Sequence, residues 1–136
     1  MKVVLDSNIL LVAVGKRSNY RPIWNAFLDG RFQLIVSEDV IFEYEEILRQ
    51  RSAPGVAPMI MEIFIESPEV IYQKIYYLWN AIKNDPDDNK FFDIAVAANA
   101  DYLVTNDAHF NIIKELNFPK IKIITAEEFL KILAKS

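Results

Sequence analysis

The sequence predicts an α/β protein in which helices cover both faces of a parallel sheet. Short apolar runs that are typical of buried strands recur along the 136 residues, at Lys2 to Leu5, Phe32 to Val36, Tyr102 to Thr105 and Ile121 to Ile124. Stretches with helical apolar spacing separate these runs. Because parallel neighbours need long crossover connections, usually helices, this alternation favours a parallel sheet.

Capping and breaking residues indicate where the helices begin and end. Ser7 or Asn8 can cap a first helix that begins near Ile9, and Thr125 and Glu128 have the spacing of a capping box for the last one. The other helices are expected at Pro22 to Asp29, Ser37 to about Gln50, Val56 to Ile65, the stretch after Asp85-Pro86-Asp87-Asp88, and His109 to Leu116.

The stretch from Val70 to Ile82 has no clear period. We expect extended structure at Val70 to Tyr72, and core packing for the aromatic side chains that follow, with a subunit interface as the alternative. In the helix after Ser37, Glu46 lies opposite the apolar stripe, while Glu43 and Glu45 flank it. Helical geometry therefore leaves two acids that could reach a cleft.

Composition is consistent with one folded domain over residues 1–136, because 52% of the residues are hydrophobic and there is no repeat or low-complexity tract. No apolar stretch is long enough for a membrane span, and the chain enters a strand directly after Met1, so we expect a cytoplasmic protein. Zero cysteines exclude thiolate metal sites. A net charge of −4 argues against a protein that coats nucleic acid non-specifically, although a nuclease with acidic residues at its centre can have such a charge.

Four acids occupy positions that could converge at one edge of the sheet. Asp6 and Asp107 follow strands, Asp88 opens a helix, and Glu43 flanks another. Crowded carboxylates repel one another unless a cation compensates them, and hard oxygen ligands favour Mg²⁺ or Mn²⁺. Such an ion polarises a phosphodiester and lowers the pKa of a bound water, and some sites of this kind hold two ions. This chemistry suits hydrolysis of a nucleic-acid backbone.

Four segments, VVLDSNIL, VSEDVIFEYEEIL, DPDDNKF and ADYLVTNDAHF, resemble in order and spacing those of a PIN domain, of the VapC-like kind that acts as the toxin of type II toxin-antitoxin pairs. The resemblance covers nearly the whole chain. It implies a three-layer α/β/α sandwich with strand order 3-2-1-4-5, and cleavage of single-stranded RNA that depends on Mg²⁺ or Mn²⁺. It also implies a homodimer and a cognate antitoxin.

The resemblance assigns roles to residues of this sequence. It implies that Asp6, Glu43, Asp88 and Asp107 are the catalytic and metal-binding acids, which selects Glu43 over Glu45, and that Ser7, Asn8 and Thr105 steady the site. Candidates for gripping substrate phosphates near the carboxyl edge are Lys16, Arg17, Arg21 and Lys90.

Asp93 is a rival of Asp88 for the third place. Five helical residues separate the two by about 7.5 Å of rise and about 140° of rotation, and this geometry disfavours binding of one ion by both. Asp93 is kept as a second-metal or supporting residue. His109, where many members carry another acid, is interpreted as structural or exposed, with metal ligation as the lesser alternative.

Two other functions compete with the nuclease. A phosphatase of the haloacid dehalogenase type also uses an acid after the first strand, but it needs a second acid two positions later, where this chain has Asn8. A catalytically degenerate PIN-like module, binding protein or RNA, is the other alternative.

Overall fold

The computed structural model describes residues 1–82, 88–114 and 119–135. Within these ranges the strands form a five-stranded sheet, all neighbours parallel, in the order β3-β2-β1-β4-β5. This confirms the predicted order. The strands are β1 Lys2–Leu5, β2 Gln33–Val36, β3 Val70–Tyr72, β4 Tyr102–Val104 and β5 Ile123–Ile124.

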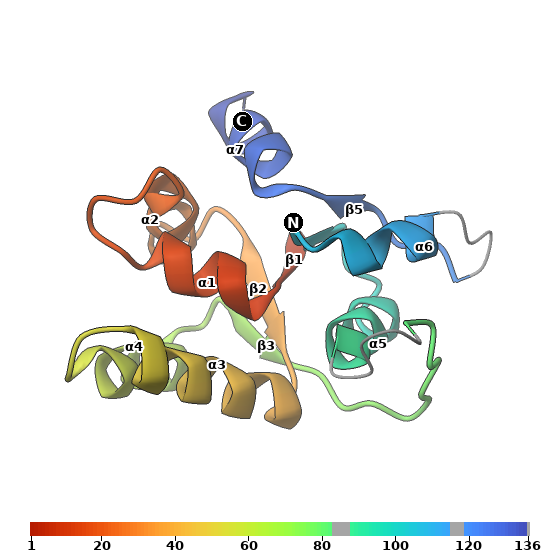
Figure 1. The fold of residues 1–136 in the computed structure, drawn as a ribbon, viewed down its shortest axis with the longest axis horizontal. Coiled ribbons are helices and arrows are strands. Elements are labelled where there is room, and N and C mark those ends of the chain that lie inside the picture. Colours follow the sequence, from red (N-terminus) through yellow and green to blue (C-terminus); the bar gives the residue numbers. More distant parts are fainter. Residues whose placement is uncertain (83–87, 115–118, 136) are drawn as a thin grey trace.

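Helices pack on both sides of this sheet and give the three-layer arrangement (Figure 1). They are α1 Ser7–Ala13, α2 Arg21–Leu28, α3 Glu38–Arg51, α4 Val56–Glu66, α5 Asn89–Ala97, the 3₁₀-helix η2 Ala108–Phe110, α6 Asn111–Lys114 and α7 Ala126–Lys135. Helix α5 contacts β1, β2 and β4, whereas α1 packs against α2 and α3. No helix in the described ranges is both long enough and apolar enough to cross a membrane.

The core lies along the central strands. Val3, Val4, Leu34, Ile35 and Leu103 are at most 1% exposed, so these strands are buried on both faces, as expected for a parallel sheet between helices. This explains why the strands were recognisable as continuous apolar runs and not as alternating ones.

Two of the predicted helix caps are confirmed. The Ser37 hydroxyl accepts a hydrogen bond from Val40 N at 3.3 Å. In the capping box, Thr125 Oγ1 accepts from Glu128 N at 3.2 Å, and Glu128 Oε1 accepts from Thr125 N at 3.0 Å. These reciprocal bonds satisfy amides at the start of α7 that have no partner within the helix.

The start of α1 was predicted wrongly. The helix begins at Ser7 and Asp6 is its N-cap residue, because Leu10 N already donates to the Asp6 carbonyl at 3.1 Å. Ser7 and Asn8 are therefore inside the helix and do not cap it. Smaller boundary errors are a last strand that starts at Ile123 and not at Ile121, and a 3₁₀ turn at the start of the helix expected from His109.

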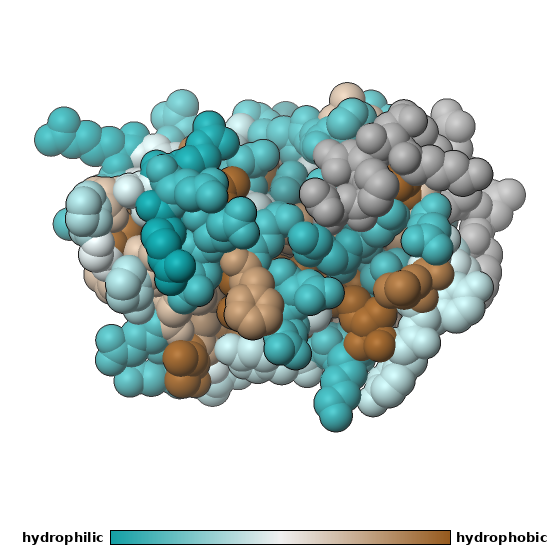
Figure 2. All heavy atoms as spheres, turned by 60° about the horizontal axis from the view of Figure 1, so that its bottom comes forward, coloured by the Kyte–Doolittle hydropathy of each residue, from teal (hydrophilic) through white to brown (hydrophobic). Residues whose placement is uncertain are grey.

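The segment after β3 differs from the prediction in its packing. Strand β3 covers Val70–Tyr72 as expected. Tyr72, Tyr76 and Tyr77 are 57%, 85% and 64% exposed, so core packing is wrong for them. Beyond this edge strand the chain runs irregularly over the surface, and Trp79 is the aromatic residue that packs against the core. Figure 2 shows apolar side chains gathered in small groups among polar ones on this side of the molecule.

Candidate active site

Parallel strands β1 and β4 are neighbours, and their carboxyl ends place two predicted acids at one edge of the sheet. Leu5 is paired with Val104, and Asp6 N donates to Val104 O at 3.0 Å. Asp6 therefore lies beside the segment that leads to Asp107. Ligand sites of open α/β sheets lie at this edge.

Thr105 connects these two acids. Its hydroxyl donates to Asp6 Oδ2 at 2.8 Å and accepts from Asp107 N at 3.0 Å, and the residue is 3% exposed. One buried side chain thus fixes both the Asp6 carboxylate and the backbone of Asp107. The Asp107 carboxylate caps η2 by accepting from His109 N at 2.9 Å.

Asp88 joins Asp107 from the other side of the edge. It is the N-cap residue of α5, and its Oδ2 lies 3.8 Å from His109 Nδ1. The same nitrogen lies 3.4 Å from Asp107 Oδ1. Ligand atoms of Asp88, Asp107 and His109 all lie within 4.8 Å of one another. The structure thus brings His109 into contact with two predicted ligands. Asp85 to Asp87, predicted to start this helix, lie outside the described residues.

Glu43 reaches the same edge from α3. Its carboxylate accepts a hydrogen bond from the Ser7 hydroxyl and, at Oε1, from Lys90 Nζ at 2.8 Å. Glu45, the other acid left open by helical geometry, pairs instead with Arg49 along the helix. Glu43 therefore lies among residues that flank Asp6 and Asp88, whereas Glu45 does not.

The carboxylates affect one another electrostatically. Burial raises the pKa of Asp6, the Thr105 hydrogen bond opposes this rise, and the charges of Glu43 and Asp107 add to it. Mutual repulsion of this kind is relieved by a bound cation. The donor set consists of carboxylate oxygens with one imidazole, which suits a hard divalent ion such as Mg²⁺ or Mn²⁺. The residues present therefore fit such an ion.

Sequence comparison decides the family. The family model described as PIN domain matches residues 2–109, which is most of the chain. The chain belongs to the PIN domain family.

Structural comparison agrees with this fold. One similar chain comes from the crystal structure of VapBC2 from Rickettsia felis bound to a DNA fragment from their promoter. The TM-score is 0.61 at 18% sequence identity, and the match covers 92% of this chain and 98% of the other. No curated protein matches the sequence. PIN domains are a nuclease family, so the acidic edge is the candidate active site.

The four basic residues that were expected to bind substrate phosphates lie in different surroundings in this PIN domain. Arg17 lines a cavity next to the acidic edge. Arg21 is used inside the fold, because its guanidinium donates to Val14 O at 2.6 Å and to Asn25 Oδ1 at 3.2 Å. Lys90 is paired with Glu43, and Lys16 is exposed. Arg17 therefore remains the best placed of the four for contact with substrate.

Asp93 lies apart from the four acids. It is 3% exposed, and its Oδ1 accepts from Trp79 N at 3.2 Å. Burial raises its pKa, and that hydrogen bond opposes the rise. It lines a second cavity together with side chains of the segment after β3, such as Tyr76. Its contacts thus anchor this segment to α5.

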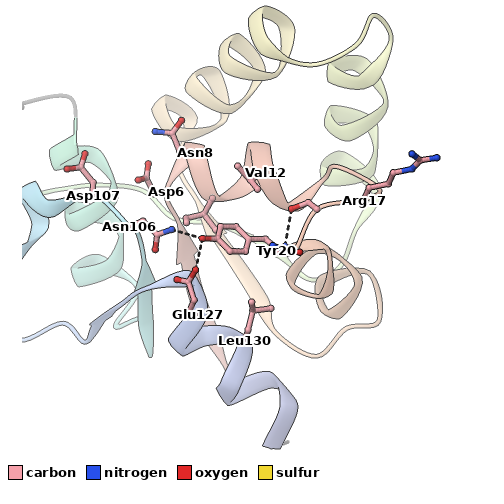
Figure 3. Close-up of a pocket in the computed structure, with 12 residues that line it drawn as sticks. Asp6, Asn8, Val12, Arg17, Tyr20, Asn106, Asp107, Glu127 and Leu130 are labelled. Atoms are coloured by element: carbon pink, nitrogen blue, oxygen red, sulfur yellow. Dashed lines mark hydrogen bonds between the residues drawn. The ribbon is translucent and has the colours of Figure 1, made fainter.

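Reasoning from the sequence missed one wall of the site. A cavity of about 940 Å³ contains Asp6 and Asp107 in its lining and extends to Tyr20 and Glu127 (Figure 3). Asn106 Nδ2 donates to the Tyr20 hydroxyl at 2.9 Å, which donates to Glu127 Oε1 at 3.0 Å. Glu127 follows β5 as Asp107 follows β4, so the strand-end rule that found Asp107 could have found it too.

Proposed function

We propose that this PIN domain is a metal-dependent endoribonuclease that hydrolyses phosphodiester bonds of single-stranded RNA. The observation that supports this most strongly is the gathering of Asp6, Glu43, Asp88 and Asp107 at one sheet edge, although they come from four different parts of the chain. A carboxylate cluster of this kind is costly unless it binds a cation. Its position beside a large cavity leaves room for a polymer.

In this proposal the four acids hold one or two Mg²⁺ or Mn²⁺ ions. When bound, such an ion polarises the phosphodiester and lowers the pKa of the attacking water. Thr105 orients Asp6 through the 2.8 Å hydrogen bond and Ser7 orients Glu43, whereas Lys90 neutralises Glu43 through an ion pair. The Lys90 ammonium also adds positive charge at an otherwise acidic edge. Asp93 has a structural role here and is not a ligand.

The proposal includes a partner protein. The resemblance to VapC-like PIN domains implies that the chain is the toxin of a toxin-antitoxin pair and that it forms a homodimer. The similar VapBC2 structure is bound to promoter DNA, which supports a partner that joins the nuclease to a DNA-binding complex. An RNA substrate places its action in the cytoplasm.

The test uses two pairs of matched variants. Asp6→Asn and Glu43→Gln should abolish Mg²⁺- or Mn²⁺-dependent cleavage of single-stranded RNA. Asp39→Asn, and Glu45→Gln on the same helix as Glu43, should cleave like the natural protein. Circular dichroism confirms that each variant is folded. Undiminished cleavage by Asp6→Asn would refute the assignment.

A binding module without catalytic activity is the second candidate. The exposed Tyr72, Tyr76 and Tyr77 favour it, because aromatic side chains are enriched in protein interfaces. Melting temperatures distinguish the two candidates. A functional site that binds Mg²⁺ or Mn²⁺ is stabilised by the ion, whereas a module without a metal site melts at the same temperature with ion or EDTA.

A further inference from the structure

The cavity beside the acidic edge has two chemically different parts. Its volume of about 940 Å³ falls within the range of about 300–1,000 Å³ usual for small-ligand sites. Apolar side chains of Ile9, Val12 and Leu130 line it together with the Tyr20 ring. Where this apolar surface ends, toward Asp6 and Asp107, stand the hydrogen-bonded groups of Asn106 and Glu127 (Figure 3). The rest of the lining is polar and comes from Asn8, Arg17, Ser18 and Asn19. Apolar surface with a polar end matches a nucleobase, whose faces are apolar and whose edge carries donors and acceptors.

The hydrogen bonds at that end have a fixed direction. Asn106 Oδ1 accepts from Ala126 N at 3.0 Å, which orients its amide so that Nδ2 donates to the Tyr20 hydroxyl. The hydroxyl then donates to Glu127 Oε1, and this bond raises the pKa of Tyr20, so the phenol stays protonated. Glu127 is thus held as an acceptor. A carboxylate has about four lone-pair sites, and the Tyr20 bond uses one.

An oriented carboxylate discriminates between the four RNA bases. Guanine alone presents two adjacent donors, N1–H and the 2-amino group, which can bond to both carboxylate oxygens. Adenine and cytosine place a ring acceptor next to their amino group, and uracil places its single N–H between two carbonyls, so each of these brings a lone pair toward the negative charge. Recognition of splayed bases by such edge contacts is common in single-stranded RNA binding.

We propose that this cavity binds a guanine base of the RNA, with Glu127 as the residue that determines specificity. The proposal rests on the proposed function, because Asp6 and Asp107 line the same cavity and would place the scissile phosphate next to the bound nucleotide. Tyr20 is a positioning residue for Glu127. A phosphate group is disfavoured at this end by the charge of Glu127.

Neutral nucleosides test the base site without requiring cleavage. Guanosine, inosine, adenosine, cytidine and uridine are titrated in EDTA, and binding is followed by amide chemical shifts. We expect guanosine to bind at least about fivefold more tightly than inosine, which lacks the 2-amino group, since one good bidentate contact discriminates by about 5- to 150-fold. Glu127→Gln should remove this preference because an amide offers one acceptor oxygen and not two.

Glu128→Gln is the matched control. Glu128 is the next residue of α7, bonds to Thr125 and does not line the cavity, and glutamine is tolerated in a capping box. Tyr20→Phe keeps the ring but frees Glu127, and should weaken the guanosine preference. Three results would overturn the proposal: equal binding of all nucleosides, no binding of any nucleoside, or a guanosine preference that survives Glu127→Gln. If no nucleoside binds, a protein segment is left as the occupant of the cavity.

Cleavage mapping separates this inference from the proposed function. In total RNA we expect guanine to be enriched next to the cut sites of the natural protein and of Glu128→Gln, and we expect Glu127→Gln to lose that enrichment. Cleavage with no base preference would remove the guanine site but keep the nuclease. Guanosine binding without cleavage would keep the guanine site but remove the nuclease.

Discussion

Thr105→Val tests whether one buried hydroxyl holds the acidic edge together. Valine keeps the shape of threonine but removes the hydrogen bonds to the Asp6 carboxylate, at 2.8 Å, and from Asp107 N, at 3.0 Å. Buried hydrogen bonds contribute about 1.5–3 kcal/mol when one partner is charged and about 0.5–1.5 kcal/mol when both are neutral. We therefore expect the free energy of unfolding in EDTA at pH 7 to fall by about 2–4 kcal/mol.

The loss should depend on pH. The Thr105 bond lowers the pKa of Asp6, so its removal raises that pKa further. A carboxyl group whose pKa is raised in the folded state contributes stability that is fully present below its unfolded pKa, about 3.9, and is lost as pH rises through the folded value. The difference between Thr105→Val and the natural protein should therefore be largest near neutral pH and smallest below about pH 4.

Urea denaturation from pH 3.5 to 8 measures this difference, and Mn²⁺ titration calorimetry measures the site directly. Thr105→Ser is the control, because it keeps the hydroxyl and loses one methyl group, worth about 0.8 kcal/mol. We expect Thr105→Ser to bind Mn²⁺ like the natural protein and Thr105→Val to bind it at least about tenfold more weakly. Equal stability and equal Mn²⁺ affinity for Thr105→Val would refute the role of this hydroxyl.

Three further substitutions test other parts of the site. Asp93→Asn should raise stability to urea at pH 7 but not below about pH 4, because burial raises the pKa of Asp93. RNA cleavage should persist in this variant, and its loss would make Asp93 a metal ligand. Asn89→Ala removes amide bonds to Ile82 N and O at 2.8 and 3.0 Å and should lower the free energy of unfolding by about 1–3 kcal/mol in the same assay, whereas no change would show that these bonds are dispensable. Lys90→Met frees Glu43 from a partly buried ion pair and should raise Mn²⁺ affinity about two- to fivefold by calorimetry; weaker binding would instead make Lys90 an organiser of the site.

The sheet and its acidic edge could be predicted because they depend on local patterns and one topological rule. Strands buried on both faces appear as continuous apolar runs, and the carboxyl ends of parallel strands meet at one edge. Asp6 and Asp107 follow from these two facts alone. Glu43 and Asp88 needed the family resemblance, because helical geometry left Glu43 equivalent to Glu45 and a first-turn acid such as Asp88 is also explained by the helix dipole.

Contacts that join distant segments could not be predicted in the same way. The pairing of Lys90 with Glu43 depends on how α5 packs against α3, and no pattern within either helix encodes it. The exposed position of Tyr76 could not be predicted either. Its neighbours have the composition of a core segment, but the chain there runs beyond the edge strand β3.

Glu127 shows how one residue can satisfy a local pattern and still serve the site. In the sequence it belongs to the first turn of α7, where an acid is favoured by the helix dipole, and this local explanation hides the fact that it follows a strand as Asp107 does. In the fold, β5 pairs with β4 and brings Glu127 to the edge that carries Asp107, while Tyr20 from the start of α2 fixes its carboxylate. The acids nearest the central strand thus form the proposed metal centre, and the acid after the edge strand, farther from Asp6 and held by a neutral phenol, is left to contact a base.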